Sequence, residues 1–301
     1  MYVSIIIPAF NAQNTIEYCL KSCLNQYQYV KEIIVIDDHS SDKTMEVVQI
    51  IQKDFPDKIF LFQNIDKGSN PARNYGFTKA TGQFIQWLDA DDELGDDKLK
   101  KQVQFLETNP QFDIAYSDWK LKIVRSDGKV EIENKKEEQC EDFLLKLLLD
   151  QWMPPHSYLL KYDAAQLIIR NLGWNPRTIV LQDREFYTVG ALLGYKFGYV
   201  KNCGVTYYRY PHLFSISKAK NEIRINSLFK LIQRIKILIE NEGLLLNKKQ
   251  LNALYSNDIM SRIILKKAIF RRIELHRIYW SIFPGSRVKL KAIFFNFLRS
   301  N

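Results

Sequence analysis

Two hydrophobic periods alternate along the first half of this 301-residue chain and restrict the folds open to it. Short apolar runs typical of buried strands alternate with segments in which apolar residues recur at helical spacing. The runs cover 3–7, 33–36, 59–63 and 84–88, and the helical segments cover 15–25, 43–53, 70–80 and 97–107. Because strands joined by helices run parallel and are covered on both faces, this order predicts an α/β fold with a mostly parallel, Rossmann-like sheet flanked by helices.

The second half continues with shorter patterns. The turn signal Ser126-Asp127-Gly128 predicts an exposed hairpin over 121–132, and the polar run 133–139 predicts a mobile loop. From Ser217 onward the apolar period is helical. We expect strands at 114–119, 157–160 and 197–208, helices at 142–149 and 184–193, and helix breaks at 241–247 and 284–285.

The composition favours a globular protein in a reducing compartment. A hydrophobic content of 46% is ordinary for a packed core, and no stretch reaches about 18 uncharged apolar residues, so no spanning helix is expected. The chain starts in a strand pattern without a secretory signal. Cys19, Cys23, Cys140 and Cys203 show no CxxC spacing and are expected to be free thiols, with a disulfide or zinc site as the minor alternative. We therefore expect a cytoplasmic protein.

Basic charge is concentrated at the end of the chain. Residues 1–210 have a net charge of −4 and residues 211–301 a net charge of +13, which together make the total of +9. This shift predicts a globular domain over 1–210 and a helical basic extension over 211–301. The extension is amphipathic over 223–238, 259–282 and 287–299. It suits peripheral attachment to an anionic membrane, or helices packed on the domain with a solvated basic face; no motif resembles a nucleic-acid reader.

Three carboxylates follow the apolar run 84–88, where the fold places the carboxyl end of a strand. Asp89, Asp91 and Asp92 repel one another unless they are well solvated, so they favour a cation. Oxygen ligands suit Mg²⁺ or Mn²⁺, and such a metal usually accompanies phosphate. The alternative is a solvated acidic turn that caps the helix beginning near Asp96.

Two other strand patterns lead into residues that suit a nucleotide. Asp37 and Asp38 follow the second strand, and Asp38 could accept a hydrogen bond from a nucleobase. Helix capping and turn formation are the alternative for both. Arg73 starts a helix after a loop containing Gly68, where it could neutralise a diphosphate or else form a surface salt bridge.

Taken together, these pieces resemble glycosyltransferase family 2 over about residues 1–210. Each motif is weak alone, but their joint spacing is specific. The motifs are Pro8-Ala9-Phe10-Asn11, Asp37-Asp38-His39-Ser40, Ala72-Arg73-Asn74-Tyr75-Gly76 and Asp89-Ala90-Asp91-Asp92. The resemblance implies a GT-A fold with a nucleotide-binding half at about 1–118 and an acceptor-binding half at about 119–210.

The resemblance also implies transfer of a sugar from a nucleoside diphosphate with inversion. Pro8 and Asp38 would hold the base, Asp91 the ribose or the metal, and Asp92 the Mn²⁺ or Mg²⁺ ion that bridges the diphosphate. Asp89 would orient this loop. The metal would stabilise the departing diphosphate. The implied nucleotide-sugar site comprises Pro8, Phe10, Asn11, Asp38, Arg73, Asp89 and Asp91.

An inverting displacement needs a base, and the family places a carboxylate before an aromatic-bearing helix. The matching segment, Leu181-Gln182-Asp183-Arg184-Glu185-Phe186-Tyr187, makes Asp183 the candidate base. Gln182 stands where family members usually have Glu. The alternative for Asp183 is a helix N-cap, and Glu185 is then the substitute base. His39 stands where the family commonly has Gly and is interpreted as accommodating a left-handed turn.

Aromatic residues of the second half are weaker candidates for acceptor contacts. His156 could line the acceptor site or be a buried structural histidine. The three tryptophans Trp119, Trp152 and Trp174 could stack on sugar rings, although in a chain with 13% aromatic residues most such rings pack in the core.

The function expected from these observations is a hexosyl- or N-acetylhexosaminyltransferase that extends a surface glycan. A UDP-sugar is the expected donor, and the expected acceptor is a hydroxyl of a growing glycan, either free or lipid-linked. One alternative transfers the sugar to a polyprenyl phosphate, which needs no base. Another is an inert membrane-surface scaffold that retains the fold.

Overall fold

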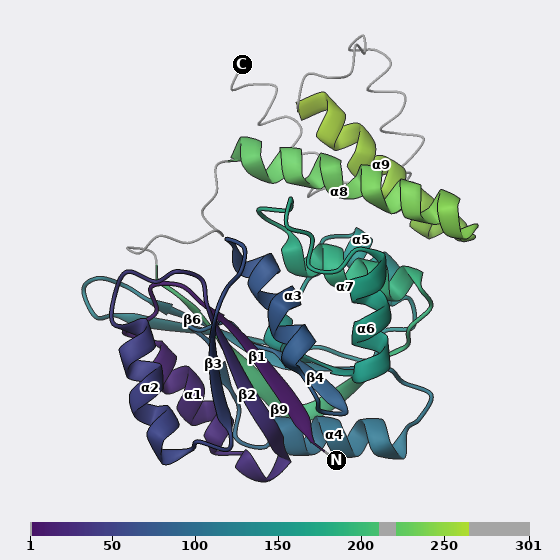
Figure 1. The fold of residues 1–301 in the computed structure, drawn as a ribbon. Coiled ribbons are helices and arrows are strands. Elements are labelled where there is room, and N and C mark those ends of the chain that lie inside the picture. The colour runs from purple at the N-terminus through teal and green to yellow at the C-terminus, as the bar shows by residue number, and fades with distance from the viewer. Residues whose placement is uncertain (1, 211–220, 265–301) are drawn as a thin grey trace.

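A computed structural model describes residues 2–210 and 221–264 of the chain (Figure 1). The strands are β1 (Val3–Ala9), β2 (Val30–Asp37), β3 (Ile59–Gln63), β4 (Phe84–Trp87), β5 (Glu93–Leu94), β6 (Ile114–Val124), β7 (Val130–Lys135), β8 (Tyr158–Lys161) and β9 (Phe197–Arg209). The α-helices are α1 (Ile16–Leu24), α2 (Thr44–Asp54), α3 (Ser69–Lys79), α4 (Lys98–Thr108), α5 (Phe143–Leu148), α6 (Tyr162–Asn171), α7 (Gln182–Leu192), α8 (Asn221–Glu242) and α9 (Lys248–Ile264).

The strands form one sheet in the order β3-β2-β1-β4-β8-β6-β9-β5, with β7 paired to β6. Strands β1 to β4 pair in parallel, as does β6 with β9. Antiparallel pairs arise where β8 inserts between β4 and β6, and at β5 and β7. The expected α/β class with a helix-flanked sheet is therefore confirmed, and the all-parallel part is the β1–β4 half.

Each face of the sheet has its own apolar core. Alternate residues of β1 point to opposite faces, so Ile5 and Ile7 belong to one core while Ile6 belongs to the other. Helices α1, α2 and α4 cover the first face, and α3, α5, α6 and α7 the second. Helix α3 packs very closely on β1, because a Cβ at Gly76 would lie 2.5 Å from Ile6 Cγ2. This approach brings the start of α3 to the sheet edge where β4 ends.

Most elements lie where the sequence predicts them. The hairpin is confirmed, since Val124 of β6 pairs with Val130 of β7. The loop expected over 133–139 is wrong at its start, because β7 continues to Lys135. Helix α6 and the two-residue strand β5 were not expected from the sequence.

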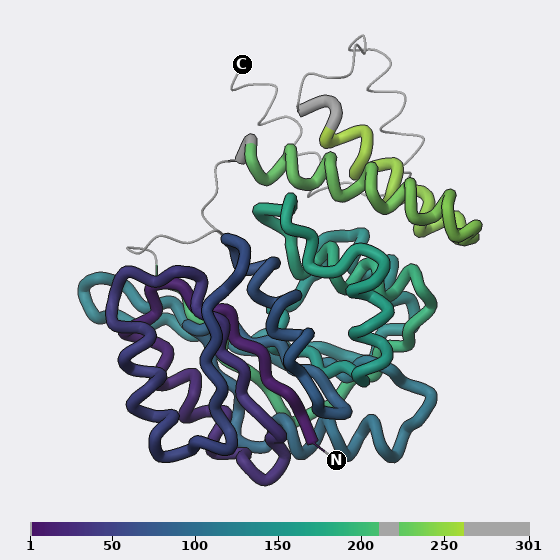
Figure 2. Tube along the Cα trace, viewed as in Figure 1, coloured from purple at the N-terminus to yellow at the C-terminus, as the bar shows by residue number. Residues whose placement is uncertain are grey.

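The described part of the basic extension packs on the domain. Helices α8 and α9 lie across α5 and α7 at one end of the molecule (Figure 2). The buried stripe of α8 joins the second core through Leu231, Ile232, Ile235 and Leu238. The break expected at 241–247 is confirmed, whereas 284–285 and 287–299 lie outside the described residues, as does most of 259–282. No helix within 2–210 and 221–264 is long and apolar enough to cross a membrane.

The cysteines are free thiols, as expected. Cys19, Cys23 and Cys203 are buried and Cys140 is half-buried. Burial raises the pKa of the Cys19 thiol well above its usual value, which keeps it protonated at neutral pH.

Candidate active site

The parallel strands β1, β2 and β3 end at one edge of the sheet, where Ala9 lies opposite Asp37 and Asp37 opposite Gln63. The residues that follow each strand therefore meet there. β4 lies beside β1 in the same direction and leads into Asp89. Ligands of open α/β sheets bind at such an edge.

Asp38 organises the nucleotide side of this edge. Its carboxylate accepts hydrogen bonds from the Asn64 amide at 2.8 Å and from the Gly68 N–H at 2.9 Å, which ties the end of β2 to the loop before α3. His39 adopts the left-handed conformation, with a φ of 63°, as the sequence predicts. Sequence reasoning missed the role of Asn64, which follows β3 as Asp38 follows β2.

The first motif is divided between core and surface. Pro8 is buried in β1 beside Ile36 of β2, whereas Phe10 is 59% exposed. The Asn11 side chain accepts from the Ser41 N–H at 2.9 Å, which links the first motif to the turn after β2. Their contacts with a nucleotide stay predictions.

Arg73 stands at the centre of the site. Its side chain is only 4% exposed, and Nη2 lies 2.6 Å from Asp89 Oδ1. Nη1 donates to the side-chain oxygens of Asn70 and Gln182, each at 3.1 Å. The guanidinium also lies over the ring of Trp174, 4.4 Å from its centroid. Arg73 is therefore a buried, multiply held cation and not a surface salt bridge.

The Gln182 side chain both accepts and donates a hydrogen bond, whereas a carboxylate can only accept. Its oxygen accepts from Arg73, while its Nε2 donates to the Thr178 carbonyl at 3.1 Å. The substitution of Gln for the usual Glu therefore adds a donor that ties α7 to the preceding loop.

The acidic loop after β4 holds three carboxylates in three environments. Asp89 pairs with Arg73, Asp91 is exposed, and Asp92 is completely buried. The surrounding protein, together with the charge of Asp89, raises the pKa of Asp91 to about 7. Burial and the charges of Asp91 and Asp89 raise the pKa of Asp92 well above its usual value. This crowding of negative charge is what a cation would relieve.

Asp92 is anchored from inside the protein. Its Oδ1 accepts from the Tyr208 N–H at 2.7 Å, and its Oδ2 lies 3.3 Å from His156 Nδ1. His156 is completely buried, and burial lowers its pKa to about 3, so the imidazole is neutral. His156 is thus a structural neighbour of the acidic loop. Sequence reasoning missed Tyr208, whose contribution comes from its backbone and leaves no signal in the side-chain pattern.

Asp183 lies inside the first turn of α7, close to these groups. The N-cap of α7 is Leu181, so the N-cap alternative for Asp183 is wrong. Burial raises the pKa of Asp183 to about 7; Arg73 opposes the rise and Asp89 adds to it. A carboxylate with a pKa near neutrality is suited to accept a proton. Glu185, the substitute candidate, is 1% exposed and accepts bonds from Arg234 and Thr178.

The three tryptophans differ in burial. Trp174 is completely buried and stacks on Phe186 with centroids 4.4 Å apart, so it cannot be a sugar platform. Trp119 and Trp152 are half-buried and stack at 6.0 Å, and Tyr207 of β9 lies beside both. These rings stay candidates for acceptor contacts.

The oxygens after β4 fit a hard divalent ion. Asp91 presents an exposed carboxylate, and the buried Asp92 Oδ2 accepts no hydrogen bond from the described residues. Within 2–210 and 221–264, no group of three or more His, Cys, Asp or Glu side chains forms a ready cage for a metal. A site of one or two carboxylates completed by substrate phosphates is the usual arrangement for such ions.

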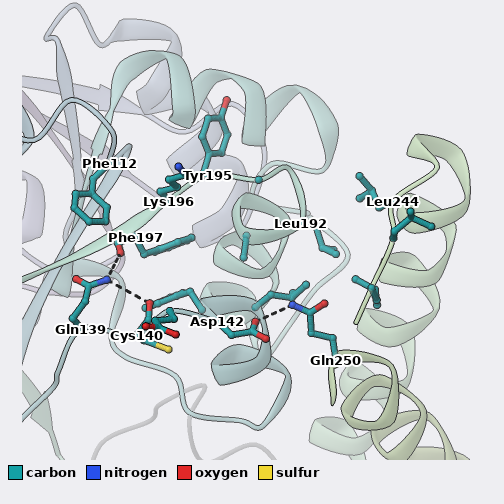
Figure 3. A pocket seen from close by; sticks show the side chains of 17 residues that line it. Phe112, Gln139, Cys140, Asp142, Leu192, Tyr195, Lys196, Phe197, Leu244 and Gln250 are labelled. Carbon is teal, nitrogen blue, oxygen red and sulfur yellow. Dashed lines mark hydrogen bonds between the residues drawn. The ribbon is translucent and has the colours of Figure 1, made fainter. Parts of the chain in front are cut away.

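A cavity of about 540 Å³ lies elsewhere, among the start of α5, the α7–β9 connection and the loop between α8 and α9. Figure 3 shows Gln250 of α9 bonded across it to Asp142. None of the candidate site residues lines this cavity.

The fold is that of solved GT-A glycosyltransferases. TarS of Staphylococcus aureus in complex with UDP-GlcNAc superimposes with a TM-score of 0.62 at 19% identity, over 97% of this chain and 77% of that chain. The mannosyltransferase PcManGT of Pyrobaculum calidifontis in complex with GDP-Man and Mn²⁺ gives 0.55 at 18% identity, over 94% and 81%.

Sequence comparison identifies the family. Residues 4–151 match the glycosyl transferase family 2 model. A GalNAc(5)-diNAcBac-PP-undecaprenol beta-1,3-glucosyltransferase of Campylobacter jejuni is 46% identical over 34% of this chain and 33% of its own. The UDP-Glc:alpha-D-GlcNAc-diphosphoundecaprenol beta-1,3-glucosyltransferase WfaP of Escherichia coli is 29% identical over 76% and 86%. Residues 4–151 of this chain therefore form a glycosyltransferase family 2 domain, and a relative of this family matches most of the chain. It spans less than half the length of the relatives that it matches at over 40% identity.

Proposed function

We propose that this protein is a metal-dependent, inverting glycosyltransferase that moves a hexosyl or N-acetylhexosaminyl group from a UDP-sugar to a hydroxyl of a lipid-linked glycan. The observation that carries the proposal is Asp183, a carboxylate of raised pKa close to the acidic loop after β4 and to the buried Arg73. A base, a phosphate-neutralising cation and metal-suited oxygens meet at one sheet edge.

Each group has a role in this proposal. Asp38, with Pro8, Phe10 and Asn11 around it, holds the nucleoside. Arg73 holds Asp89 in place and lowers the cost of bringing a diphosphate beside three carboxylates. Asp91 is the principal metal ligand because its carboxylate is exposed. The buried Asp92 is the second carboxylate of the metal site. When bound, Mn²⁺ or Mg²⁺ supplies charge that stabilises the departing diphosphate.

Asp183 takes the proton from the acceptor hydroxyl as its oxygen bonds to the anomeric carbon. The bond from that carbon to the diphosphate breaks on the opposite face, so the configuration inverts. General base catalysis of this kind typically contributes about 10²- to 10⁴-fold.

The relatives support the acceptor class and the donor. Both named bacterial relatives act, by their names, on undecaprenol diphosphate-linked sugars, and the TarS structure holds UDP-GlcNAc. A lipid-linked acceptor would place the reaction at the cytoplasmic face of the membrane, and the basic extension would supply peripheral attachment to anionic lipid.

The test is Mn²⁺-dependent release of UDP from a panel of UDP-sugars, with and without a lipid-diphosphate-linked sugar acceptor. Asp183→Asn should lower transfer by about 10²-fold or more while donor binding persists. Asp163→Asn is the matched control, because Asp163 is the second residue of α6 as Asp183 is of α7.

Three outcomes separate the candidates. Transfer that Asp183→Asn abolishes supports the proposal. Full activity of Asp183→Asn toward a polyprenyl phosphate favours the acceptor that needs no base. Absence of donor binding and turnover in the wild type, with Mn²⁺ and acceptor present, overturns the enzyme assignment in favour of the scaffold.

A further inference from the structure

Arg234 reaches from the C-terminal helix α8 into the domain that carries the active site. Its Nε donates to Glu185 Oε1 of α7, and its Nη2 donates to Thr178 Oγ1 at 2.9 Å. Thr178 in turn donates to the other oxygen of Glu185, which closes a three-residue ring. The Glu185 side chain is only 2% exposed and that of Arg234 20%, so the ion pair is shielded from solvent.

The ring continues directly into the site through the loop before α7. The Thr178 carbonyl accepts from Gln182 Nε2 at 3.1 Å and from Asn70 Nδ2 at 3.3 Å. The oxygens of these two side chains accept from Arg73, which pairs with Asp89. A continuous hydrogen-bonded path therefore runs from α8 to the acidic loop.

The backbone of this loop needs such support. Leu181, directly before Gln182 and Asp183, adopts a left-handed conformation with φ 66° and ψ 25°. A leucine rarely adopts this conformation, and it persists only where its surroundings enforce it. Thr178 and Glu185 lie on either side of Leu181, and Arg234 holds both. Arg234 of α8 therefore contacts the residues on both sides of the turn that leads into Asp183.

We propose that Arg234 is a positioning residue that makes the C-terminal helices part of the catalytic unit, by fixing the loop and first turn that aim Asp183 at the acceptor. The inference rests on the proposed function for the role of Asp183. It concerns the described helix α8 and goes beyond the membrane attachment suggested for the extension.

The expected effect falls on turnover and not on donor binding. Without Arg234, Glu185 is a buried carboxylate that has lost its cation, so it and Thr178 must move and Leu181 can relax. A misplacement of about 1 Å can cost about 10²-fold in rate. Arg234→Gln should lower kcat by about 10- to 100-fold and change the donor KM by less than about 3-fold, because Asp38 and Asp91 lie outside the ring.

The matched control lies two residues along the same helix. Lys236 forms an ion pair with Asp258 between α8 and α9 and does not contact α7 in the described contacts. Lys236→Gln therefore removes an ion pair of α8 without touching the ring. Arg234→Lys keeps the charge but cannot bond Glu185 and Thr178 in the same bidentate manner, so it should restore activity in part.

Two measurements on the full chain test the inference. The first is kcat and KM for Mn²⁺-dependent UDP release from UDP-glucose and UDP-N-acetylglucosamine in all four proteins. The second is amide hydrogen exchange across 175–185, which does not depend on activity. We expect faster exchange in this segment for Arg234→Gln and wild-type exchange for Lys236→Gln.

The results separate the inference from the proposed function. Equal kcat for Arg234→Gln and Lys236→Gln, with an active wild type, overturns the positioning role and leaves the transferase intact. An inactive wild type overturns the proposed function, and exchange then decides whether Arg234 holds the loop. Unchanged exchange over 175–185 in Arg234→Gln would overturn the inference in either case.

Discussion

Arg73 and Asp89 form an ion pair, with 2.6 Å between Nη2 and Oδ1, at the junction of α3 and the loop that follows β4. The arginine is buried and the aspartate half-buried. Because Asp183 lies close enough for Arg73 to lower its pKa, one guanidinium controls both the acidic loop and the candidate base.

Arg73→Gln should therefore move the acid limb of the kcat–pH profile to higher pH. Loss of the cation raises the pKa of Asp183 above its present value of about 7, so less of the base is deprotonated at pH 7. Turnover should fall at pH 7 and recover toward pH 9. Profiles from pH 6 to 9 test this, and Arg73→Lys, which keeps the charge, should stay near the wild type. Superimposable limbs for wild type and Arg73→Gln would contradict the prediction.

Asp183→Asn should stabilise the protein at pH 8 although it removes activity. The folded-state pKa of about 7 exceeds the model-peptide value of 3.8, so the folded state binds this proton more tightly than the unfolded state does. The stabilisation from the bound proton is present below about pH 4 and is lost as pH rises to about 7. Asparagine does not titrate, so we expect a gain of about 1–3 kcal/mol at pH 8.

Urea unfolding at pH 5 and pH 8 measures this gain. The difference between Asp183→Asn and wild type should be larger at pH 8 than at pH 5. Asp163→Asn serves as the control and should show little difference at either pH, since Asp163 is exposed. If Asp183→Asn is less stable than wild type at pH 8, the charge of Asp183 does not destabilise the folded state and the prediction is wrong.

Substitutions of Asp91 and Asp92 should have different effects, the first on metal binding and the second on the stability of the fold. Asp91→Asn should weaken Mn²⁺-dependent UDP binding by at least about 10-fold without a loss of Tm, because Asp91 is exposed. Asp92→Ala should cost about 1–3 kcal/mol, because the part-buried hydrogen bond from the Tyr208 N–H loses its acceptor. Asp92→Asn retains that acceptor and should keep most of the stability. Calorimetric titration measures Mn²⁺-dependent UDP binding in each variant. Binding that is lost in Asp92→Asn but kept in Asp91→Asn would reassign the principal ligand to Asp92.

Leu231→Ala should show that α8 belongs to the folded core. Leu231 is completely buried in the second core, and truncating such a leucine typically costs about 2–5 kcal/mol. Ile237→Ala on the same helix is the control, since Ile237 is 54% exposed and should change stability by less than about 1 kcal/mol. Chemical denaturation of both variants measures the free energy of unfolding. Equal losses of stability in the two variants would mean that α8 detaches without affecting the core.

Local patterns were enough to predict the elements that build the sheet. Apolar runs for β1 to β4, each followed by a helical period, leave few arrangements other than parallel strands, and the residues after those strands then share an edge. Asp38 and Asp89 could be placed at one site for this reason, before any contact was known. The left-handed conformation of His39 was predicted from the resemblance, because His39 stands where the family commonly has Gly.

The partners of these residues could not be predicted in this way. The bonds from Gln182 to Arg73 and from Arg234 to Glu185 join segments far apart in the chain, and no periodicity marks them. Asp92 stays a predicted metal ligand, but no pattern indicated that its Oδ1 accepts a hydrogen bond from the Tyr208 backbone N–H. The packing of α8 against α7 was one of two alternatives that the amphipathic pattern left open.

The sequence by itself determined the strand and helix order, the edge where the site forms and the acidic and basic residues gathered there, because these depend on hydrophobic period and on chain direction. Only the tertiary structure decided which carboxylate is exposed, which is buried, and which cation each one meets. Burial and distance set the cost of a charge, and both arise from contacts between residues that are distant in the chain.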